Sequence, residues 1–399
     1  MAAPSPGMKV VHALPTYLPI SENWIYPQIV GVSGIEPAVL CDGVSNTELF
    51  PLHSAPVFLD PPPWKRAAGL PRLINSIGFR LGREQLIASR EIARWQPRLV
   101  HAHFGSTGWS TRSLARRVGA PLITSFYGMD AWLLPEQNAF WRTRFVELFR
   151  DGDLFLVEGP AMRERLVVLG CPRAKIRIAR LGVAVDELSF RERTFAAPLH
   201  VIMVARFVAK KGMPDGLRAC VAARQAGVDL RVTIIGAASD PAGEIIGNEL
   251  RQIAGSRELA GRVEFTGFQT PTRTRELMDG ADVFLCPSQH SPDGDAEGGS
   301  PLSLTQAMAM GLLCIGTRHC DIPEVIRDRE TGLLCESRDV PALADLITSA
   351  AGEPQAVQAM CRNGRAHIEA RFSSAAMTAG LAELYAEVTS EAEVRTAPA

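Results

Sequence analysis

Residues 293–311 hold the pattern with the clearest chemistry in this chain. An acid, Glu297, leads into Gly298–Gly299. Ser300–Pro301 then predicts a helix that runs to Gly311, because serine is a favoured N-cap and proline suits the first helical position. Glycines before a helix let a phosphate reach exposed N–H groups at the positive end of the helix dipole, and a neighbouring carboxylate suits sugar hydroxyls. Taken alone, the pattern fits an ordinary loop–helix connection equally well.

Two kinds of cation follow a buried strand in a second segment. The apolar run 201–204 predicts the strand, Arg206 comes just after it, and Lys210, Lys211 and Gly212 lie in the following loop. Ligands of open α/β sheets collect at the carboxyl ends of strands. Arginine supplies a planar fork of donors there and lysine a compact charge, which together suit a diphosphate. The competing interpretation is a solvated basic turn.

Together the two segments resemble the retaining glycosyltransferases of family 4. Arg206, Lys211 and Gly212 meet the family's R-x4-K-G pattern, and Glu297 begins its second motif. Within this family, the chain resembles the subgroup with an E-G-G-x-P donor loop. It implies the GT-B fold, in which two Rossmann-like, doubly wound parallel-sheet domains face each other across a cleft. Further agreements are Gly236, Gly267, Ala307–Gly311, Asp321–Val325 and Thr331–Leu333.

The resemblance assigns roles to these residues. It makes Arg206, Lys211 and Glu297 the catalytic set, with the two cations on the departing diphosphate and the carboxylate on hydroxyls of the donor sugar. It implies no cofactor and no metal, because cations and a helix dipole serve the diphosphate. The expected donor-binding residues are Gly298, Gly299, Ser300, Pro301, Leu302, Ser303, Gln306, Gly236 and Gly267.

Gln306 departs from the family pattern, which has a glutamate that usually accepts from the nucleotide ribose. It lies nine positions after Glu297, where the common spacing is eight, an offset shared by members with the E-G-G-x-P loop. An amide still bonds a hydroxyl but loses the charge-assisted part, about 1 kcal/mol. We therefore expect weaker nucleotide affinity but retained activity.

A loop after the first strand resembles the family's S-E-T-F-I variant. Ser21, Glu22, Trp24 and Ile25 occupy its positions, and such a loop would contact acceptor or donor phosphate in the cleft. The alternative is a helix N-cap at Ser21 with Trp24 in the core.

His101 and His103 end another strand in an H-A-H-F-G sequence. Alternation places both side chains on one strand face, and the sequence shows no third metal ligand. The resemblance places His103 at the cleft mouth as a substrate contact, and the alternative is a packed histidine.

Tyr127 and Asp130 match the family's F-H-G-x-D, with tyrosine where histidine is commoner. A tyrosine, with a reference pKa of about 10, cannot act as a base near neutral pH, which favours a positioning role. Asp130 is either a cleft residue or the cap of the following helix. Asp293–Asp295 resembles a metal-binding D-x-D, but the same pattern at 151–153 indicates that both are loop acids.

The region 64–98 has eight basic and two acidic side chains among leucines and isoleucines. A basic apolar segment can bind the anionic inner membrane face, as in family members with lipid-linked acceptors, and the alternative is a solvated helix face.

Composition places the chain among globular proteins that stay in the cytoplasm. Its 399 residues suffice for two domains, 46% are hydrophobic, and the net charge of −1 argues against bulk nucleic-acid binding. The eight cysteines show no zinc or C-x-x-C spacing, so they indicate reduced thiols. No signal peptide and no apolar run of roughly 20 residues is evident.

Alternating strands and helices predict a parallel sheet in each half. We expect an acceptor domain at 1–190, a nucleotide-sugar domain at 199–372, a terminal helix at 373–390 that returns to the first domain, and a disordered tail at 391–399. The predicted strands are 9–14, 38–40, 99–102, 122–125, 154–157, 201–204, 231–235, 263–265, 283–286, 312–315 and 333–335.

These features predict a metal-independent hexosyltransferase of the retaining type, working in cell-surface polysaccharide biosynthesis. It would move a sugar from a nucleotide diphosphate to a hydroxyl of a glycan, one carried on lipid at the inner membrane face. A nucleotide-sugar epimerase and a non-catalytic GT-B-fold protein that binds a glycan or partner are the alternatives. A dehydrogenase is disfavoured, since no G-x-G-x-x-G follows a first strand.

Overall fold

The chain forms two compact units in a computed structural model that describes residues 7–53, 55–59 and 89–396. The first unit comprises 1–182 and 374–399, and the second comprises 183–373. The chain therefore changes unit at Val183, slightly before residues 190–199, where the sequence placed the boundary between the two domains. Residues from 374 onward belong to the first unit.

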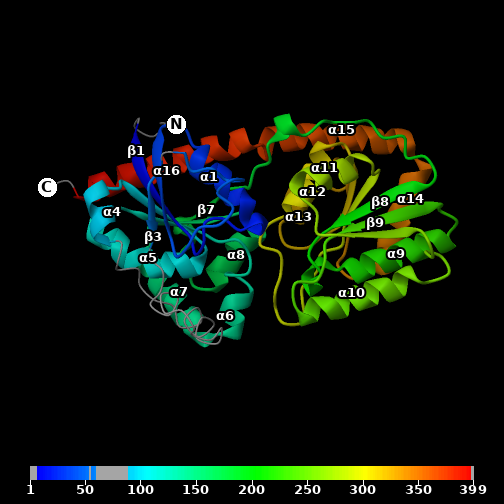
Figure 1. The fold of residues 1–399 in the computed structure, drawn as a ribbon, viewed down its shortest axis with the longest axis horizontal. Coiled ribbons are helices and arrows are strands. Elements are labelled where there is room, and N and C mark those ends of the chain that lie inside the picture. The colour runs from blue at the N-terminus through cyan, green and yellow to red at the C-terminus, as the bar shows by residue number, and fades with distance from the viewer. Residues whose placement is uncertain (1–6, 54, 60–88, 397–399) are drawn as a thin grey trace. The chain divides into compact units, whose positions relative to one another are not determined.

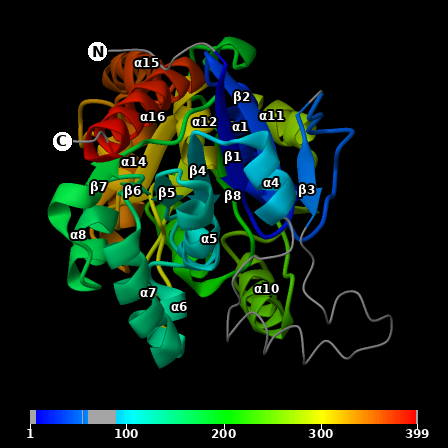
Figure 2. The same ribbon diagram turned by 90° about the vertical axis from the view of Figure 1, so that its left-hand side faces the viewer.

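The first unit is built on a seven-stranded sheet, drawn in Figures 1 and 2. All its strand pairs are parallel, and the spatial order is β3-β2-β1-β4-β5-β6-β7, so the order reverses between β1 and β4. The strands are β1 (Met8–Ala13), β2 (Ile35–Cys41), β3 (Val57–Leu59), β4 (Leu99–His103), β5 (Leu122–Ser125), β6 (Leu154–Val157) and β7 (Ile176–Ile178).

Helices cover both faces of this sheet because its strands are apolar on both sides. Val11 and Val100 pack under the helices α5 and α7, whereas Val10 and Leu99 pack under α16. The helices of the unit are η1 (Ile20–Ile25, a 3-10 helix), α1 (Tyr26–Val30), α4 (Ser89–Trp95), α5 (Gly105–Val118), α6 (Leu133–Gln137), α7 (Ala139–Asp151), α8 (Pro160–Val168), η2 (Arg173–Lys175) and α16 (Ser374–Thr396).

The second unit repeats this plan with a six-stranded parallel sheet. Its order is β10-β9-β8-β11-β12-β13, so the reversal lies between β8 and β11. Alternate residues serve opposite faces: Val201 packs in one core layer and Ile202 in the other. The strands are β8 (Leu199–Val204), β9 (Leu230–Ile235), β10 (Val263–Gly267), β11 (Val283–Cys286), β12 (Leu313–Thr317) and β13 (Leu333–Cys335).

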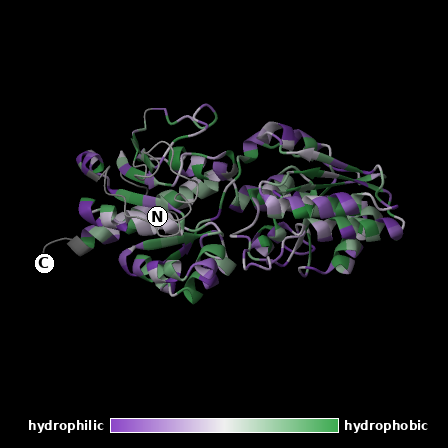
Figure 3. Cartoon of the chain, turned by 60° about the horizontal axis from the view of Figure 1, so that its bottom comes forward, coloured by the Kyte–Doolittle hydropathy of each residue, from purple (hydrophilic) through white to green (hydrophobic). Residues whose placement is uncertain are grey.

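Several helices begin where the sequence supplies an N-cap. Asp240 and Thr270 accept hydrogen bonds from backbone N–H groups three residues later, and a proline follows each at the first helical position. Many helices combine hydrophilic and hydrophobic stretches, as Figure 3 shows. The helices of the second unit are η3 (Val185–Glu187), η4 (Ala209–Lys211), α9 (Met213–Gln225), α10 (Pro241–Ala254), α11 (Pro271–Asp279), α12 (Leu302–Ala309), α13 (Ile322–Val325), α14 (Val340–Gly352) and α15 (Pro354–Arg371).

The structure confirms parallel α/β sheets in both halves and corrects three local expectations. The strands β3 and β7 were not predicted: each has only three residues and lies at a sheet edge. The helix α16 continues to Thr396, beyond residue 391, because alanine and glutamate favour helix there. The helix α12 begins at Leu302 and ends at Ala309, within the predicted 300–311.

The eight cysteines are free thiols, all of them buried except Cys320, which is partly exposed. Among the described residues, no helix has the length and apolar character that crossing a membrane requires.

Candidate functional site

The reversal between β8 and β11 places the predicted donor-binding residues of the second unit together. Arg206 and Lys211 follow the carboxyl end of β8, and Ser288 and Glu297 follow the carboxyl end of β11. The two strands are hydrogen-bonded neighbours. A strand-order reversal leaves room for a ligand between the diverging connections, so this edge is the expected binding position of the sheet.

Lys211 and Glu297 form an ion pair at this edge. The Lys211 Nζ lies 2.7 Å from one carboxylate oxygen of Glu297 and 2.9 Å from the other. Ser288 donates a hydrogen bond to Glu297 Oε1 at 2.8 Å. Burial raises the pKa of Glu297, but the ammonium groups of Lys211 and Lys210 outweigh it and the pKa lies below its usual value. Glu297 is therefore a buried carboxylate that stays charged.

Lys210 has a different role from its neighbour. Its Nζ lies 2.9 Å from Asp295 Oδ2 and donates to the Ala296 carbonyl at 3.0 Å. The side chain is mostly buried, so the solvated-turn interpretation does not apply to it. Lys210 thus ties η4 to the residues immediately before Glu297, and Asp295 is a loop acid that accepts this contact.

Arg206 is exposed, and no hydrogen bond or ion pair engages its guanidinium within the described part of the chain. Of the two predicted diphosphate cations, one is therefore open to an anion and the other is held by a carboxylate. Gln306 is half-buried on α12. Arg206, Lys211, Glu297 and Gln306 remain predictions as ligand contacts.

The helix start expected at Ser300 lies two residues later. Pro301 is the N-cap, with an extended ψ of 130°, and no side chain caps the first N–H groups. Proline's N–H is missing and its preceding residue avoids helical angles, so the Ser300–Pro301 pair stays outside the helix. The hydroxyl of Ser303 donates to the Val204 carbonyl at 3.4 Å and packs α12 against the end of β8. Gly298 and Gly299 are buried, and Leu302 is half-buried.

Glycines at this edge allow close backbone approach. A Cβ at Gly212 would lie 1.9 Å from the Pro287 carbonyl oxygen, and one at Gly236 would lie 1.8 Å from the Ala205 oxygen. Gly236 also donates to the Gly267 carbonyl at 2.9 Å, with φ at 131° and 70° in the two residues. The donor-binding role predicted for Gly236 and Gly267 stays a prediction, while their contacts bring the ends of β8, β9 and β10 together.

His319 is a residue of this site that the sequence did not reveal. Its Nε2 accepts a hydrogen bond from the backbone N–H of Glu297 at 3.3 Å. Burial lowers the pKa of His319 to about 4, so the ring stays neutral and can accept. It lies two residues before the Asp321–Val325 motif, but no spacing rule connects it with Glu297.

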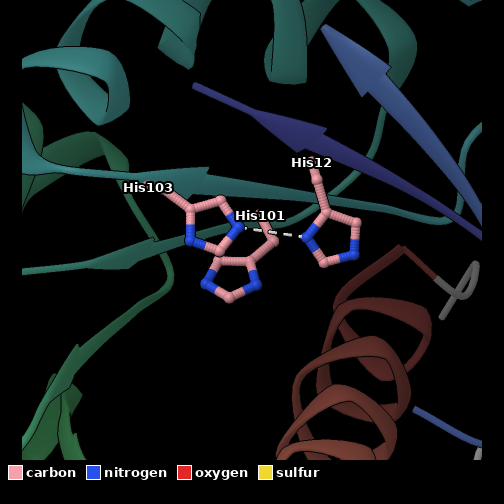
Figure 4. Close-up of side chains that lie close together, drawn as sticks. All are labelled: His12, His101 and His103. Atoms are coloured by element: carbon pink, nitrogen blue, oxygen red, sulfur yellow. Dashed lines mark hydrogen bonds between the residues drawn. The ribbon is translucent and has the colours of Figure 1, made fainter. Parts of the chain in front are cut away.

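The reversal in the first unit, between β1 and β4, carries neutral polar groups instead of charges. His12 pairs with His101 in the register of the two strands, and His103 lies two residues further along β4. All three rings are buried. The expectation that no third ligand accompanies His101 and His103 is wrong, because His12 brings a ring nitrogen within 4.8 Å of theirs (Figure 4). It was missed because the strand register was unknown.

Hydrogen bonds already occupy the ring nitrogens of the two β4 histidines. The nitrogens of His101 bond Tyr385 Oη at 2.7 Å and Ser125 Oγ at 2.8 Å. His103 Nδ1 bonds Tyr127 Oη at 2.7 Å, and its Nε2 lies 3.1 Å from His12 Nδ1. His103, predicted as a substrate contact, lies beneath Tyr127 as a packed histidine would.

Asp130 is buried and holds two loops together. One carboxylate oxygen accepts from Gly105 N at 2.7 Å, at the start of α5, and the other from Tyr127 N at 3.0 Å. It therefore caps α5, which precedes it, and not the helix that follows it. Burial raises the pKa of Asp130 to about 6 although these N–H groups oppose the shift.

The segment after β1 holds Glu22 and Trp24, of which Trp24 lies beside Tyr127. Glu22 is half-buried, and burial raises the pKa of its carboxyl group. Trp24 lies edge-on to Tyr127 with ring centroids 5.9 Å apart. The side chain of Ser21 lies outside the described structure, so its predicted contact stays a prediction.

Comparison with known proteins identifies the family. The family model described as Glycosyltransferase Family 4 matches residues 33–187, and that of Glycosyl transferases group 1 matches residues 185–367. The amylovoran biosynthesis glycosyltransferase AmsK of Erwinia amylovora is 30% identical over 289 residues, which cover 71% of this chain and 68% of AmsK. The chain belongs to glycosyltransferase family 4.

Another relative of this family 4 chain is the putative colanic acid biosynthesis glycosyltransferase WcaL of Escherichia coli (strain K12). It is 35% identical over 255 residues, covering 62% of this chain and 60% of WcaL. The chain thus spans about 60% of that relative's length. A solved structure of Anabaena Alr3699/HepE in complex with UDP-glucose has a TM-score of 0.72 at 16% identity, covering 95% of this chain and all of that one. With the two parallel sheets, this similarity shows the GT-B fold.

The basic region of the family 4 chain lies mostly outside the described residues. Residues 60–88, which hold Arg66, Arg72, Arg80 and Arg83, are not described. In α4, Arg90 and Arg94 are exposed and Ile92 is buried, the pattern of an ordinary solvated helix face.

Proposed function

We propose that this protein is a retaining glycosyltransferase that moves a sugar from a nucleotide diphosphate onto a glycan hydroxyl in polysaccharide biosynthesis. The observation that carries the proposal is the group at the β8/β11 reversal: the segment after β8 holds an exposed arginine, Arg206, and the Lys211 that pairs with Glu297. A nucleotide sugar contains an anionic diphosphate and a sugar with several hydroxyl groups. Cationic and carboxylate groups at one sheet edge match these parts.

The names of relatives support the biological setting. WcaL is named for colanic acid biosynthesis, AmsK for amylovoran biosynthesis, and a 26% identical relative in Rhizobium meliloti for lipopolysaccharide core biosynthesis. Alr3699/HepE, which shares the fold, was solved in complex with UDP-glucose. These names favour a UDP-type donor and an acceptor in polysaccharide biosynthesis. That the acceptor glycan is carried on lipid in the cytoplasm is our proposal.

In the proposed reaction the bond from the anomeric carbon to the diphosphate oxygen breaks, and a bond to the acceptor oxygen forms. Negative charge develops on the diphosphate as it leaves, and Arg206 and Lys211 neutralise it without a metal ion. Glu297 accepts hydrogen bonds from donor-sugar hydroxyls, and Gln306 bonds the ribose. The acceptor hydroxyl attacks the same face that the diphosphate leaves and gives its proton to an oxygen of the departing diphosphate.

Binding of a nucleotide tests the proposal first. We would measure the melting temperature of the full chain with UDP, GDP, ADP and their sugars, for the native protein and for Arg206→Ala. Ligand at about 100 times its dissociation constant adds about 2.7 kcal/mol of stability. Arg257→Ala is the matched control, because Arg257 is exposed in the same unit but lies before β10, at the amino ends of the strands.

The expected result is stabilisation by one nucleotide that Arg206→Ala loses and Arg257→Ala retains. No stabilisation by any of them would instead favour a non-catalytic binding protein. A nucleotide sugar that is converted to its stereoisomer without an acceptor would favour an epimerase.

Peripheral contact with the inner membrane face is part of the proposal because the acceptor is lipid-linked. Co-sedimentation with liposomes that contain anionic lipid at low salt tests it, with neutral liposomes as the control. Failure to sediment with the anionic liposomes would remove the membrane contact and leave the donor chemistry unaffected.

A further inference from the structure

Each of the three central strands of the first unit changes character along its length on the face that packs against α16. The amino-terminal positions are apolar, with Val10 on β1, Leu99 on β4 and Ile123 on β5 in one core cluster with α16. At the carboxyl ends the same face carries His12, His101, His103 and Ser125. A buried polar group therefore lies directly under the loop edge where ligands of such sheets bind.

A single backbone carbonyl determines the direction of the hydrogen bonds in this group. Gln28 Nε2 donates to the carbonyl of Trp24 at 3.2 Å, so its Oε1 is the end that faces Tyr127. That oxygen can only accept, and the Tyr127 hydroxyl therefore donates to it, at 3.3 Å. A hydroxyl has one proton, so every other bond at Tyr127 Oη must be one that it accepts.

This constraint determines which ring nitrogen carries the proton in His103 and then in His12. His103 Nδ1 carries the proton that Tyr127 accepts. A neutral imidazole has one N–H, so His103 Nε2 is bare and accepts from His12 Nδ1. His12 Nε2 is then bare as well, and this buried atom has no hydrogen-bond partner among the described residues. A bare nitrogen is the cheaper atom to leave unpaired, since orphaned buried N–H groups are rarer than under-satisfied acceptors.

His101 is hydrogen-bonded to a separate pair of hydroxyl groups on the same face. Its Nε2 lies 2.8 Å from Ser125 Oγ, and its Nδ1 lies 2.7 Å from Tyr385 Oη of α16. Each of these hydroxyls can donate or accept, so the Gln28 constraint determines the tautomers of His12 and His103, both protonated on Nδ1.

The Tyr127 hydroxyl consequently makes two hydrogen bonds of fixed direction within the unit. It donates its one proton to Gln28 and accepts from His103. Asp130 fixes its backbone N–H as well. The Tyr127 side chain is nevertheless partly exposed, and its ring lies edge-on to Trp24 and to Phe104, whose centroid is 5.1 Å away.

We propose that His103 and His12 are positioning residues that lock the Tyr127 hydroxyl, so that Tyr127 presents its ring and not its hydroxyl to the acceptor. The proposal rests on the proposed transferase function. An aromatic face beside Trp24 suits the C–H face of a sugar ring, which is apolar. This edge of the sheet would then recognise the apolar face of an acceptor sugar ring. Other groups would bind the hydroxyls of that sugar.

The histidines keep this arrangement at physiological pH because they stay neutral. Burial lowers the pKa of His12 to about 3. Burial, and then the neighbouring histidines, hold the pKa values of His101 and His103 well below 6.5. Burial also raises the pKa of Tyr127 above its usual value, which keeps its proton on the hydroxyl. A charged ring would carry two N–H groups and could not accept a hydrogen bond, which would break the chain of hydrogen bonds that ends at Tyr127.

The protonation pattern is tested without any substrate. In full-length protein with 15N-labelled histidine, NMR should find the rings of His12 and His103 neutral at pH 7, both protonated on Nδ1. His12→Leu, His103→Leu and His101→Leu assign the signals. A different pattern, or a charged ring, overturns the proposal. One equivalent of zinc that co-purifies and is lost in His12→Leu also overturns it, because these nitrogens would then be metal ligands.

Kinetics test the role of the ring on an acceptor to which transfer has been found. Tyr127→Phe keeps the ring and should leave the acceptor KM within about 2-fold, whereas Tyr127→Leu should raise it roughly 2- to 10-fold. His103→Asn keeps a donor at the δ position and should resemble the native protein, whereas His103→Leu removes the same hydrogen bond as Tyr127→Phe and should change the acceptor KM to the same small extent, with the donor KM unchanged. An equal rise for Tyr127→Phe and Tyr127→Leu would overturn the proposal.

Failure of the proposed function gives a different result from failure of this inference. If no acceptor accepts sugar, the transferase proposal is wrong, and the NMR pattern still decides whether the histidines lock Tyr127.

Discussion

Lys211 and Glu297 lie 86 positions apart in the sequence and form an ion pair of 2.7 Å at the β8/β11 reversal. The same lysine is predicted to meet the donor diphosphate. It must therefore divide its charge between a fixed carboxylate and a ligand, whereas Arg206 is exposed with no partner among the described residues. We therefore expect the removal of Arg206 and the removal of Lys211 to have different effects on the stability of the protein.

We predict that Arg206→Ala and Lys211→Ala both lower the transfer rate by about 100- to 1,000-fold, the usual cost of losing one preorganised charge donor. The two variants should differ in their free energy of unfolding. Lys211→Ala leaves Glu297 buried without its main partner and should cost about 3 kcal/mol of unfolding free energy, whereas Arg206→Ala should change it by less than about 0.5 kcal/mol. Steady-state kinetics and urea unfolding measure the two effects. An unchanged rate in either variant would overturn its assignment.

Gln306→Glu should tighten binding of the nucleotide sugar. The carboxylate restores a charge-assisted hydrogen bond to the ribose, about 1 kcal/mol or roughly 5-fold in dissociation constant. Titration calorimetry with the preferred nucleotide measures it, and Gln289→Glu serves as a control glutamine in the same unit. Weaker binding by Gln306→Glu would contradict the ribose contact.

The buried histidines should make the folded state sensitive to acid. Burial lowers the pKa of His12 to about 3 and that of His319 to about 4, below 6.5 in the unfolded chain. Below pH 6.5 the unfolded chain binds more protons, so stability is fully present above pH 6.5 and is lost as pH falls towards 4. Each such histidine adds a slope of up to about 1.4 kcal/mol per pH unit. Urea unfolding between pH 4 and 8 should show this, with a smaller slope in His12→Leu.

Gly236→Ala should destabilise the second unit by about 1–3 kcal/mol, through a positive φ and a Cβ that would overlap the Ala205 oxygen. Gly255→Ala is the matched control, because its φ is −77° and its Cβ would meet only ordinary contacts near 3.5 Å. Thermal unfolding of the two variants compares them. Equal melting temperatures would show that the end of β8 relaxes away from residue 236.

The sequence predicted the parallel sheets and the proximity of Lys211 to Glu297 through local patterns. Buried parallel strands are apolar on both faces, so runs such as 154–157 and 283–286 are recognisable one at a time. The loops that follow them carry the chemistry, and family resemblance connected the two loops. Nothing in this reasoning required the register between strands.

What was missed depends on that register or on neighbours far along the chain. His12 meets His103 only because β1 lies beside β4, a relation between residues 91 positions apart. His319 meets Glu297 across a loop. The start of α12 was misplaced for a local reason: Pro301 prefers extended ψ here, which overrode the serine N-cap rule.

The thiols would let each unit report its own opening. Cys41 and Cys171 belong to the first unit and the other six cysteines to the second, and a buried thiol reacts with a probe only when motion exposes it. Labelling rates read peptide by peptide would separate the opening free energies of the two units in one sample. Cys320, whose Sγ lies 3.4 Å from His319 Nε2, would report release of the loop that holds Glu297, and a bound nucleotide should slow its labelling.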